Sequence, residues 1–238
     1  MPKCIIIKVE NNQSERIYTP KDIGYFRSTD RPFENYRLLF GISPPELKKN
    51  AVILDAGSGK RQEFARGLAK LRPDIQVISL DPSLSLPTDA KSLKKMGIYY
   101  DIVSLSRKHK TTKADRDSRL KNKFGDIIPA IAPHLPFKDQ SFDYIFDNHG
   151  PFMYFAPDQN ELQRYVGELL RILKPEGQLN IYPLDTYSEG LDDDEKKLQA
   201  SRTRIENIMQ AIGVTTFETF TALDVGRHNR LGVKIFKK

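Results

Sequence analysis

The chain has 238 residues, a formal net charge of +7 and a single cysteine, Cys4. That is enough length for one domain with its own core, and one cysteine excludes a disulfide framework within the chain. Four scattered histidines show no metal-ligand spacing, so no metal site is expected. No apolar run reaches the ~20 residues of a membrane-spanning helix or forms a signal-peptide core. The sequence therefore predicts a cytoplasmic protein with no membrane partner, and it leaves the oligomeric state open.

The first 50 residues are predicted to form a separate N-terminal segment. It begins with a strand candidate at Cys4–Val9 and continues as an aromatic-rich stretch. That stretch contains Tyr18, Tyr25, Phe26, Phe33 and Tyr36. The main domain is predicted to span residues 51–238.

Strands alternate with helices from residue 51 onward. The buried strand candidates are Val52–Leu54, Val77–Leu80 and Tyr144–Phe146. Between the first two, apolar residues at i, i+4 and i+7 predict a helix that buries Phe64, Leu68 and Leu71. This alternation is typical of an α/β fold with a doubly wound, mostly parallel sheet.

The last third of the chain continues this pattern and then departs from it. Helices are predicted from Asp158 and from the acids at 192–194, with a strand at Leu179–Leu184 between them. The strand candidates Thr216–Phe220 and Val233–Phe236 follow, joined by about a dozen residues without a helical pattern. Two strands joined so closely are expected to be antiparallel, which gives the sheet a C-terminal antiparallel pair.

A basic insertion is predicted at about residues 84–126. Residues 91–123 hold eleven Lys or Arg and three Asp, a net charge of +8, so the rest of the chain carries −1. Two interpretations stay open. The segment is a solvated helical or disordered insertion, or it guides a phosphate-bearing substrate or a nucleic acid electrostatically.

The run DAGSG at residues 55–59 follows a predicted strand and precedes a predicted helix. It is not a P-loop, because Leu54 and Arg61 occupy positions that need glycine and Ser or Thr. It matches the first half of the dinucleotide fingerprint, with Gln62 at the third glycine position. Asp81 ends the next predicted strand, where a carboxylate can hold the hydroxyls of an adenosine ribose.

Four motifs occur in order: LDAGSG at residues 54–59, Asp81, APHLPFKDQSFD at 132–143 and LRILKPEGQLNI at 170–181. Together they resemble a class I S-adenosylmethionine-dependent methyltransferase with a type 11 methyltransferase-like domain. The resemblance covers about residues 50–183. It implies a Rossmann-like fold, and a reversed last strand agrees with the predicted antiparallel pair.

The same resemblance implies roles for particular residues. Asp55 would lie beneath the methionine end of the cofactor, and the turn at Gly57, Ser58 and Gly59 would approach it. Asp81 would bind the ribose hydroxyls, and Pro82, Ile131 and Ala132 would flank the adenine. Asp147 would lie near the methionine amine and the transferred methyl group. The family's third glycine is Arg61 here, and the acid that usually reads the adenine is Ile131.

The predicted function is methyl transfer from S-adenosylmethionine to an acceptor, with a small molecule favoured. Asp147 and His149 are the candidates for a catalytic proton acceptor. The aromatic residues before residue 40, with Phe152, Tyr154 and Phe155, would form the lid and wall of the acceptor pocket. Two alternatives stay open. One is an RNA- or protein-directed methyltransferase that uses the basic insertion, and the other is a non-catalytic binding module of the same fold.

Overall fold

The computed structural model describes residues 5–9, 14–18, 33–59, 62–80, 124–128, 135–154, 159–184, 194–223 and 229–238. The strands are β1 Ile5–Val9, β2 Ser14–Tyr18, β3 Val52–Ala56, β4 Gln76–Leu80, β5 Asp126–Ile128, β6 Phe142–Asn148, β7 Leu173–Tyr182, β8 Phe217–Leu223 and β9 Asn229–Phe236. The α-helices are α2 Phe33–Phe40, α3 Glu63–Leu71, α7 Gln159–Ile172 and α8 Asp194–Ala211, and the 3-10 helices are η2 Pro44–Glu46 and η4 Pro151–Tyr154.

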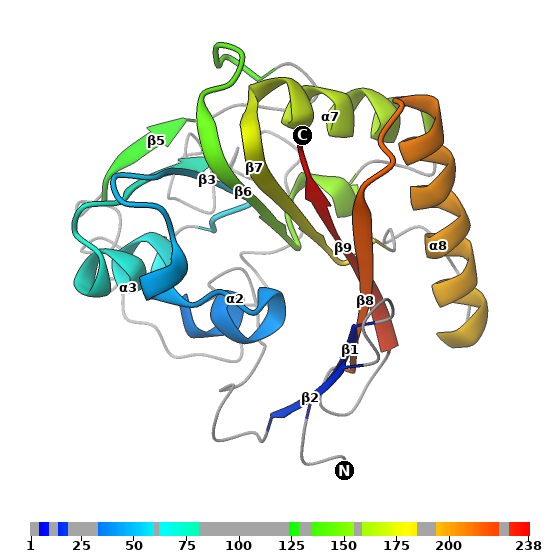
Figure 1. Cartoon of the computed structure of the whole chain (residues 1–238). Coiled ribbons are helices and arrows are strands. Elements are labelled where there is room, and N and C mark those ends of the chain that lie inside the picture. The colour runs from blue at the N-terminus through cyan, green and yellow to red at the C-terminus, as the bar shows by residue number, and fades with distance from the viewer. Residues whose placement is uncertain are drawn as a thin grey trace, which may run out of the picture.

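The strands form one nine-stranded sheet in the order β2-β1-β8-β9-β7-β6-β3-β4-β5 (Figure 1). The five strands from β5 to β7 are mutually parallel, and β9 is antiparallel to both β7 and β8. The prediction of a doubly wound, mostly parallel sheet with a C-terminal antiparallel pair is therefore confirmed. The strand order reverses between β3 and β6, and such a switch point is where α/β sheets bind ligands.

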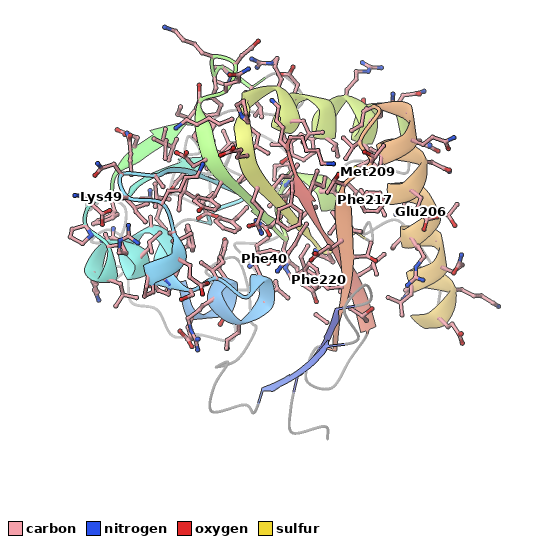
Figure 2. All side chains as sticks on the ribbon, viewed as in Figure 1. Phe40, Lys49, Glu206, Met209, Phe217 and Phe220 are labelled. Atoms are coloured by element: carbon pink, nitrogen blue, oxygen red, sulfur yellow. The ribbon has the colours of Figure 1, made fainter. Side chains whose placement is uncertain are left out.

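Helices cover both faces of the sheet, α2 and α3 on one and α7 and α8 on the other (Figure 1). Neighbouring residues of one strand point to opposite faces. Ile53 accordingly packs with the α2 and α3 residues, whereas Leu54 packs with the α7 and α8 residues. In Figure 2, Phe40 lies near Phe220 in the core on the α2 and α3 side of the sheet. Glu206 points away from the core on the α7 and α8 side.

The structure corrects two details of the predicted helices. Leu71 was expected on the buried face of α3, but it is 57 % exposed because it is the last residue of that helix. Helix α2 was not predicted at all. It carries Phe33, Tyr36 and Phe40, at i, i+3 and i+7, and all three are buried.

The aromatic residues of α2 are buried in the core. They therefore do not form the exposed surface of a lid over an acceptor pocket. The ring centroid of Tyr36 lies 4.3 Å from that of Phe64 on α3 and 6.0 Å from that of Phe146 on β6. Phe152, which was predicted for the pocket wall, is also fully buried. Tyr25, Phe26 and Phe155 lie outside the described residues, and no side chain is described for Tyr18 or Tyr154.

Two sequence motifs are joined by Arg171 of the LRILKPEG run. Its guanidinium donates to the main-chain oxygens of Leu135 and Phe137 at 3.2 and 2.9 Å, both in the LPF run. It also bonds to Asp139 at 2.6 Å and to Glu168 at 2.9 Å. The planar guanidinium suits so many acceptors at once. The two motifs therefore form one structural unit.

Replacing Arg171 with alanine is expected to lower the free energy of unfolding by about 2 kcal/mol, because the loop at Leu135–Asp139 loses its attachment to α7. Urea denaturation would measure the change. Arg164→Ala removes an exposed arginine from the same helix and is the matched control, expected within about 0.5 kcal/mol of the wild type. Equal stabilities of the two variants would contradict the role of Arg171.

Asp143 at the start of β6 gives the protein a specific acid sensitivity. Burial alone would raise the pKa of Asp143, but the Lys174 ammonium at 2.7 Å and the Val52 amide at 2.9 Å lower that pKa below its usual value. The folded state thus favours the carboxylate. Its stabilising contribution is present above the unfolded-state pKa of about 3.9 and is lost as the pH falls through the lower folded-state value.

The Asp143→Asn variant is therefore expected to lose stability near neutral pH and to show a flatter decline in stability below about pH 4. Urea unfolding from pH 2.5 to pH 7 would measure both effects. Glu206→Gln, at an exposed position on α8, is the control. An Asp143→Asn curve parallel to that of the wild type would contradict the linkage.

Candidate functional site

The candidate site lies at the carboxyl ends of β3 and β6, on either side of the switch point. The turn after β3 has two glycines in left-handed conformations, Gly57 at φ 79° and Gly59 at φ 70°. The main-chain amides of Gly57 and Ser58 donate to the Leu80 oxygen at 2.7 and 3.3 Å. These bonds hold the turn against the end of β4.

Gly57 faces a third glycine across the switch point. A Cβ atom on Gly57 would overlap Cα of Gly150, and a Cβ atom on Gly150 would overlap the main-chain oxygen of Ala56 and Oδ1 of Asp147. The loop after β6 therefore packs against the turn after β3 without any intervening side chain. Only glycine at both positions permits this approach.

Asp55, near the end of β3, is fully buried. Its Oδ1 accepts a hydrogen bond of 2.7 Å from the hydroxyl of Tyr36, which is also buried. Because Tyr36 lies on α2, that helix helps to fix the carboxylate beside the glycine turn. This contact explains why α2 carries a tyrosine among its buried phenylalanines.

Asp147, near the end of β6, is the centre of a buried hydrogen-bond network. Its carboxylate accepts from the amide of Gly150 at 2.9 Å, the amide of Phe152 at 3.1 Å and the hydroxyl of Tyr165 at 2.9 Å. Burial and the charge of Asp147 raise the pKa of Tyr165 well above its ordinary value, so this hydroxyl stays a donor. The carboxylate thereby fixes the loop that leads into η4.

His149 joins the ends of β6 and β7. Its backbone is left-handed at φ 54°, and its amide donates to the Tyr182 oxygen at 2.5 Å. The imidazole lies edge-on to the Tyr182 ring at 5.2 Å between centroids, and its Nδ1 lies 3.1 Å from Oδ1 of Asn148. The side chain is half-buried, and one ring nitrogen has a polar neighbour that influences its tautomer.

Six of the predicted site residues thus lie at the carboxyl ends of β3 and β6, namely Asp55, Gly57, Ser58, Gly59, Asp147 and His149. The other predicted residues, Asp81, Pro82, Ile131 and Ala132, lie outside the described residues, as do Arg61 and the basic segment 91–123. Tyr36 is a predicted lid residue, but its bond to Asp55 and that of Tyr165 to Asp147 are not predictable from the sequence, because the partners are 19 and 18 positions apart in the chain. The glycine in the run DNHGP, directly after a predicted strand, is a sequence signal for Gly150.

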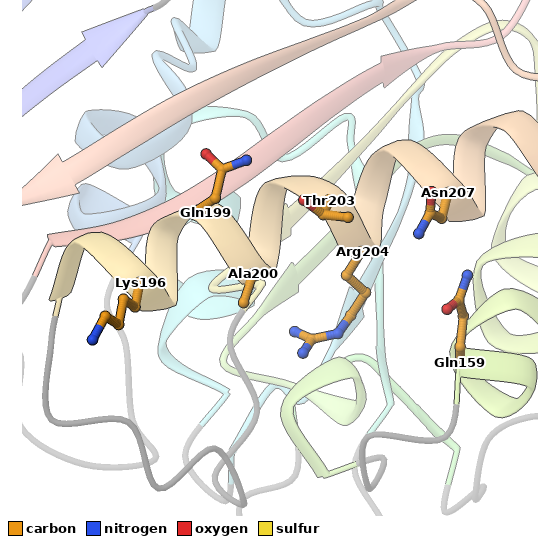
Figure 3. A pocket seen from close by; sticks show the side chains of 7 residues that line it. All are labelled: Gln159, Lys196, Gln199, Ala200, Thr203, Arg204 and Asn207. Atoms are coloured by element: carbon orange, nitrogen blue, oxygen red, sulfur yellow. The ribbon is translucent and has the colours of Figure 1, made fainter.

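A separate hollow of about 470 Å³ lies between the first residue of α7 and one face of α8 (Figure 3). It is lined by Gln159, Lys196, Gln199, Ala200, Thr203, Arg204 and Asn207. Arg204 donates to the Leu184 oxygen at 3.0 Å and so attaches α8 to the chain that follows β7. None of the predicted site residues lines this hollow.

In the part of the chain that the structure describes, no three His, Cys, Asp or Glu side chains are grouped so that they could hold a metal ion. Within the same residues, no helix has the length and apolar character needed to span a membrane.

The site suits a group that must approach the backbone closely. The glycine turn precedes the N-terminus of α3, where amides and the helix dipole favour a negatively charged group. The turn packs directly against the backbone of Gly150, so no side chain lies between the two loops, and the buried carboxylate of Asp55 lies next to the turn. These features fit a charged ligand that binds against the backbone of the turn.

The chain matches one protein family, described as a methyltransferase domain, over residues 54–181, which is more than half of its length. Among curated proteins, none is similar enough to count as a match. The family match begins just before the glycine turn and ends in β7, so it contains the glycine turn, both buried aspartates and His149.

Several solved structures resemble the chain distantly. One is an S-adenosylmethionine-dependent methyltransferase from Methanococcus maripaludis, at 20 % identity and a TM-score of 0.48, covering 87 % of this chain and 83 % of the other. A Methanosarcina mazei methyltransferase has 16 % identity and a TM-score of 0.46, covering 80 % and 93 %. The Burkholderia thailandensis 1,6-didemethyltoxoflavin-N1-methyltransferase has 17 % identity and a TM-score of 0.45, covering 79 % and 72 %.

Proposed function

Because the chain belongs to the methyltransferase-domain family and is a class I S-adenosylmethionine-dependent methyltransferase, we propose that it methylates a small-molecule acceptor at the carboxyl ends of β3 and β6. The observation that supports this site is the glycine turn at the switch point, with Gly57 in contact with Gly150 and the Asp55 carboxylate alongside. Outside residues 91–123 the chain carries a net charge of −1, so the domain itself does not attract a polyanion.

Residues of the turn and of β3 would hold the cofactor. In this proposal the turn at Gly57, Ser58 and Gly59 approaches its amino-acid end, Asp55 lies beneath that end, and Asp81 binds the ribose hydroxyls. Pro82, Ile131 and Ala132 flank the adenine. The bound sulfonium supplies an electrophilic methyl group, so the protein's main task is to position the acceptor in line with it.

We assign the proton acceptor to His149 and a positioning role to Asp147. His149 is half-buried at the edge of the site, and an imidazole accepts a proton near neutral pH. The Asp147 carboxylate already accepts hydrogen bonds from two amides and a tyrosine. It therefore acts on the reaction by fixing the loop that carries His149.

Calorimetric titration of the protein with S-adenosylhomocysteine tests cofactor binding directly. The Asp81→Ala variant is expected to bind about 1–3 kcal/mol more weakly, because the buried ribose hydroxyls lose a charged acceptor. Unchanged affinity in that variant would refute the assignment of Asp81. No binding by the wild type would favour the non-catalytic module.

The segment 91–123 supports one alternative, an RNA-directed enzyme, because its net charge of +8 suits a phosphate backbone. Replacement of four of its cations by glutamine distinguishes the two proposals. If RNA binding depends steeply on salt in the wild type and not in the variant, the RNA-directed enzyme becomes the leading proposal. If neither protein shows that dependence, the small-molecule proposal stands. The four positions are Lys108, Lys110, Lys113 and Arg116.

A further inference from the structure

Gln62, the last residue before α3, has an unusual backbone for its type. Its φ of 52° and ψ of 41° are left-handed, and the side chain is buried, with 2 % exposed. Only glycine, and to a lesser degree asparagine or aspartate, adopts this conformation readily. A glutamine stays in it only where its surroundings hold it there.

The Gln62 side chain shows what holds it. Its Nε2 donates to the main-chain oxygen of Phe124 at 2.6 Å, and its Oε1 accepts from the main-chain amide of Phe124 at 3.0 Å. It makes no capping bond to the start of α3. One turn along the helix, the guanidinium of Arg66 lies 5.3 Å from the centroid of the Phe124 ring. We call these three residues, Gln62, Arg66 and Phe124, the latch.

Gln62 of the latch is the last residue of the cofactor turn, directly before α3. The turn connects Ala56 to Glu63, and Gly57, Gly59 and Gln62 within it are all left-handed. One side of the turn is held by β4, through the bonds of Gly57 and Ser58 to Leu80. The other end of the turn is held by the latch, through the bonds of Gln62 to Phe124, which lies shortly before β5.

We propose that Gln62 is a positioning residue that fixes the shape of the cofactor turn through its two bonds to Phe124. This inference rests on the proposed cofactor site. It also connects two parts of the chain, because Phe124 directly follows the basic segment 91–123. A displacement of Phe124 would therefore also displace Gln62, the residue that ends the turn.

Two variants remove the side-chain bonds and keep the backbone geometry accessible. Gln62→Asn adopts left-handed backbone but is one methylene too short, and Gln62→Gly removes the side chain. The matched control is Gln76→Ala. Gln76 also bonds to the β5 region, from its Nε2 to Oδ2 of Asp126 at 2.6 Å, but it is exposed at the start of β4, away from the turn.

Hydrogen exchange of the cofactor-free protein is the first readout. In Gln62→Asn and Gln62→Gly, the amide of Phe124 is expected to exchange at least about tenfold faster because it loses its acceptor. The amides of Gly57 and Ser58 are expected to exchange faster with it. Unchanged exchange at Gly57 and Ser58 would overturn the proposal, and this holds whether or not the protein binds the cofactor.

Affinity for S-adenosylhomocysteine is the second readout. We expect Kd to rise about tenfold in both Gln62 variants and to stay at the wild-type value in Gln76→Ala. Faster exchange with an unchanged Kd would overturn the positioning role. No binding by the wild type would refute the proposed function, while the exchange result would still decide whether the latch shapes the turn.

If the Gln62 variants do not fold, Arg66→Met tests the Phe124 side of the latch instead, because it removes the cation from the Phe124 ring and so weakens the hold on the residue to which Gln62 bonds. The amides of Phe124, Gly57 and Ser58 are expected to exchange faster than in the wild type, by less than the increase expected for the Gln62 variants. Wild-type exchange in that variant would count against the latch.

Discussion

Gly57→Val is expected to abolish measurable binding of S-adenosylhomocysteine in a protein that still folds. The first atom of the new side chain would overlap Gly150, and valine strains the left-handed backbone at φ 79°. Overpacking of this kind costs about 1–3 kcal/mol, less than the whole stability of an ordinary domain. The turn and the loop after β6 must therefore move apart, and the surface that meets the cofactor changes.

The matched control for Gly57→Val is Gly167→Val on α7, because no atom lies within 4 Å of a Cβ added there. Calorimetry would measure affinity, and circular dichroism would verify folding. Normal binding by Gly57→Val would show that the turn does not touch the cofactor.

Asp147→Asn is expected to have the largest effect on stability, a loss of about 3–5 kcal/mol in the free energy of unfolding. The asparagine has nearly the shape of aspartate, but it places an amide where the carboxylate accepts from Gly150, Phe152 and Tyr165. At least one buried donor then lacks an acceptor, and such donors are costly.

Tyr165→Phe is the graded comparison for Asp147→Asn, since it removes one of the three donors and leaves the carboxylate. A loss of about 1–2 kcal/mol is expected. Urea denaturation of both variants would measure the order of the effects. If Asp147→Asn lowered the methylation rate at unchanged stability, Asp147 would act as the proton acceptor and the positioning role would be wrong.

The parts of the fold that were predictable depend on local patterns. The buried runs of β3, β4 and β6 and the helical spacing of Phe64 and Leu68 each lie within a few residues, and all appear in the structure. The antiparallel pair was predicted because its connection is short, and its strands proved longer than expected, ending at Leu223 and starting at Asn229.

The parts that were not predictable depend on distant contacts. Tyr36 reaches Asp55 across 19 positions, and Gln62 reaches Phe124 across 62. No spacing in the sequence marks such pairs, because each is set by how α2, α3 and the sheet pack. The absence of the third fingerprint glycine at Gln62 was visible, but what the glutamine does instead was not.

The pairing of β1 with β8 places Ile7 opposite Ala222, so two ends of the chain meet in one sheet. Synthesis proceeds from the N-terminus, and β1 therefore leaves the ribosome long before its partner exists. Pairings between residues so distant in sequence form slowly. Until β8 emerges, the β1–β2 hairpin has an open edge, which is a risk for association with other chains. Closure of the sheet at β1 and β8 is therefore expected among the last events of folding.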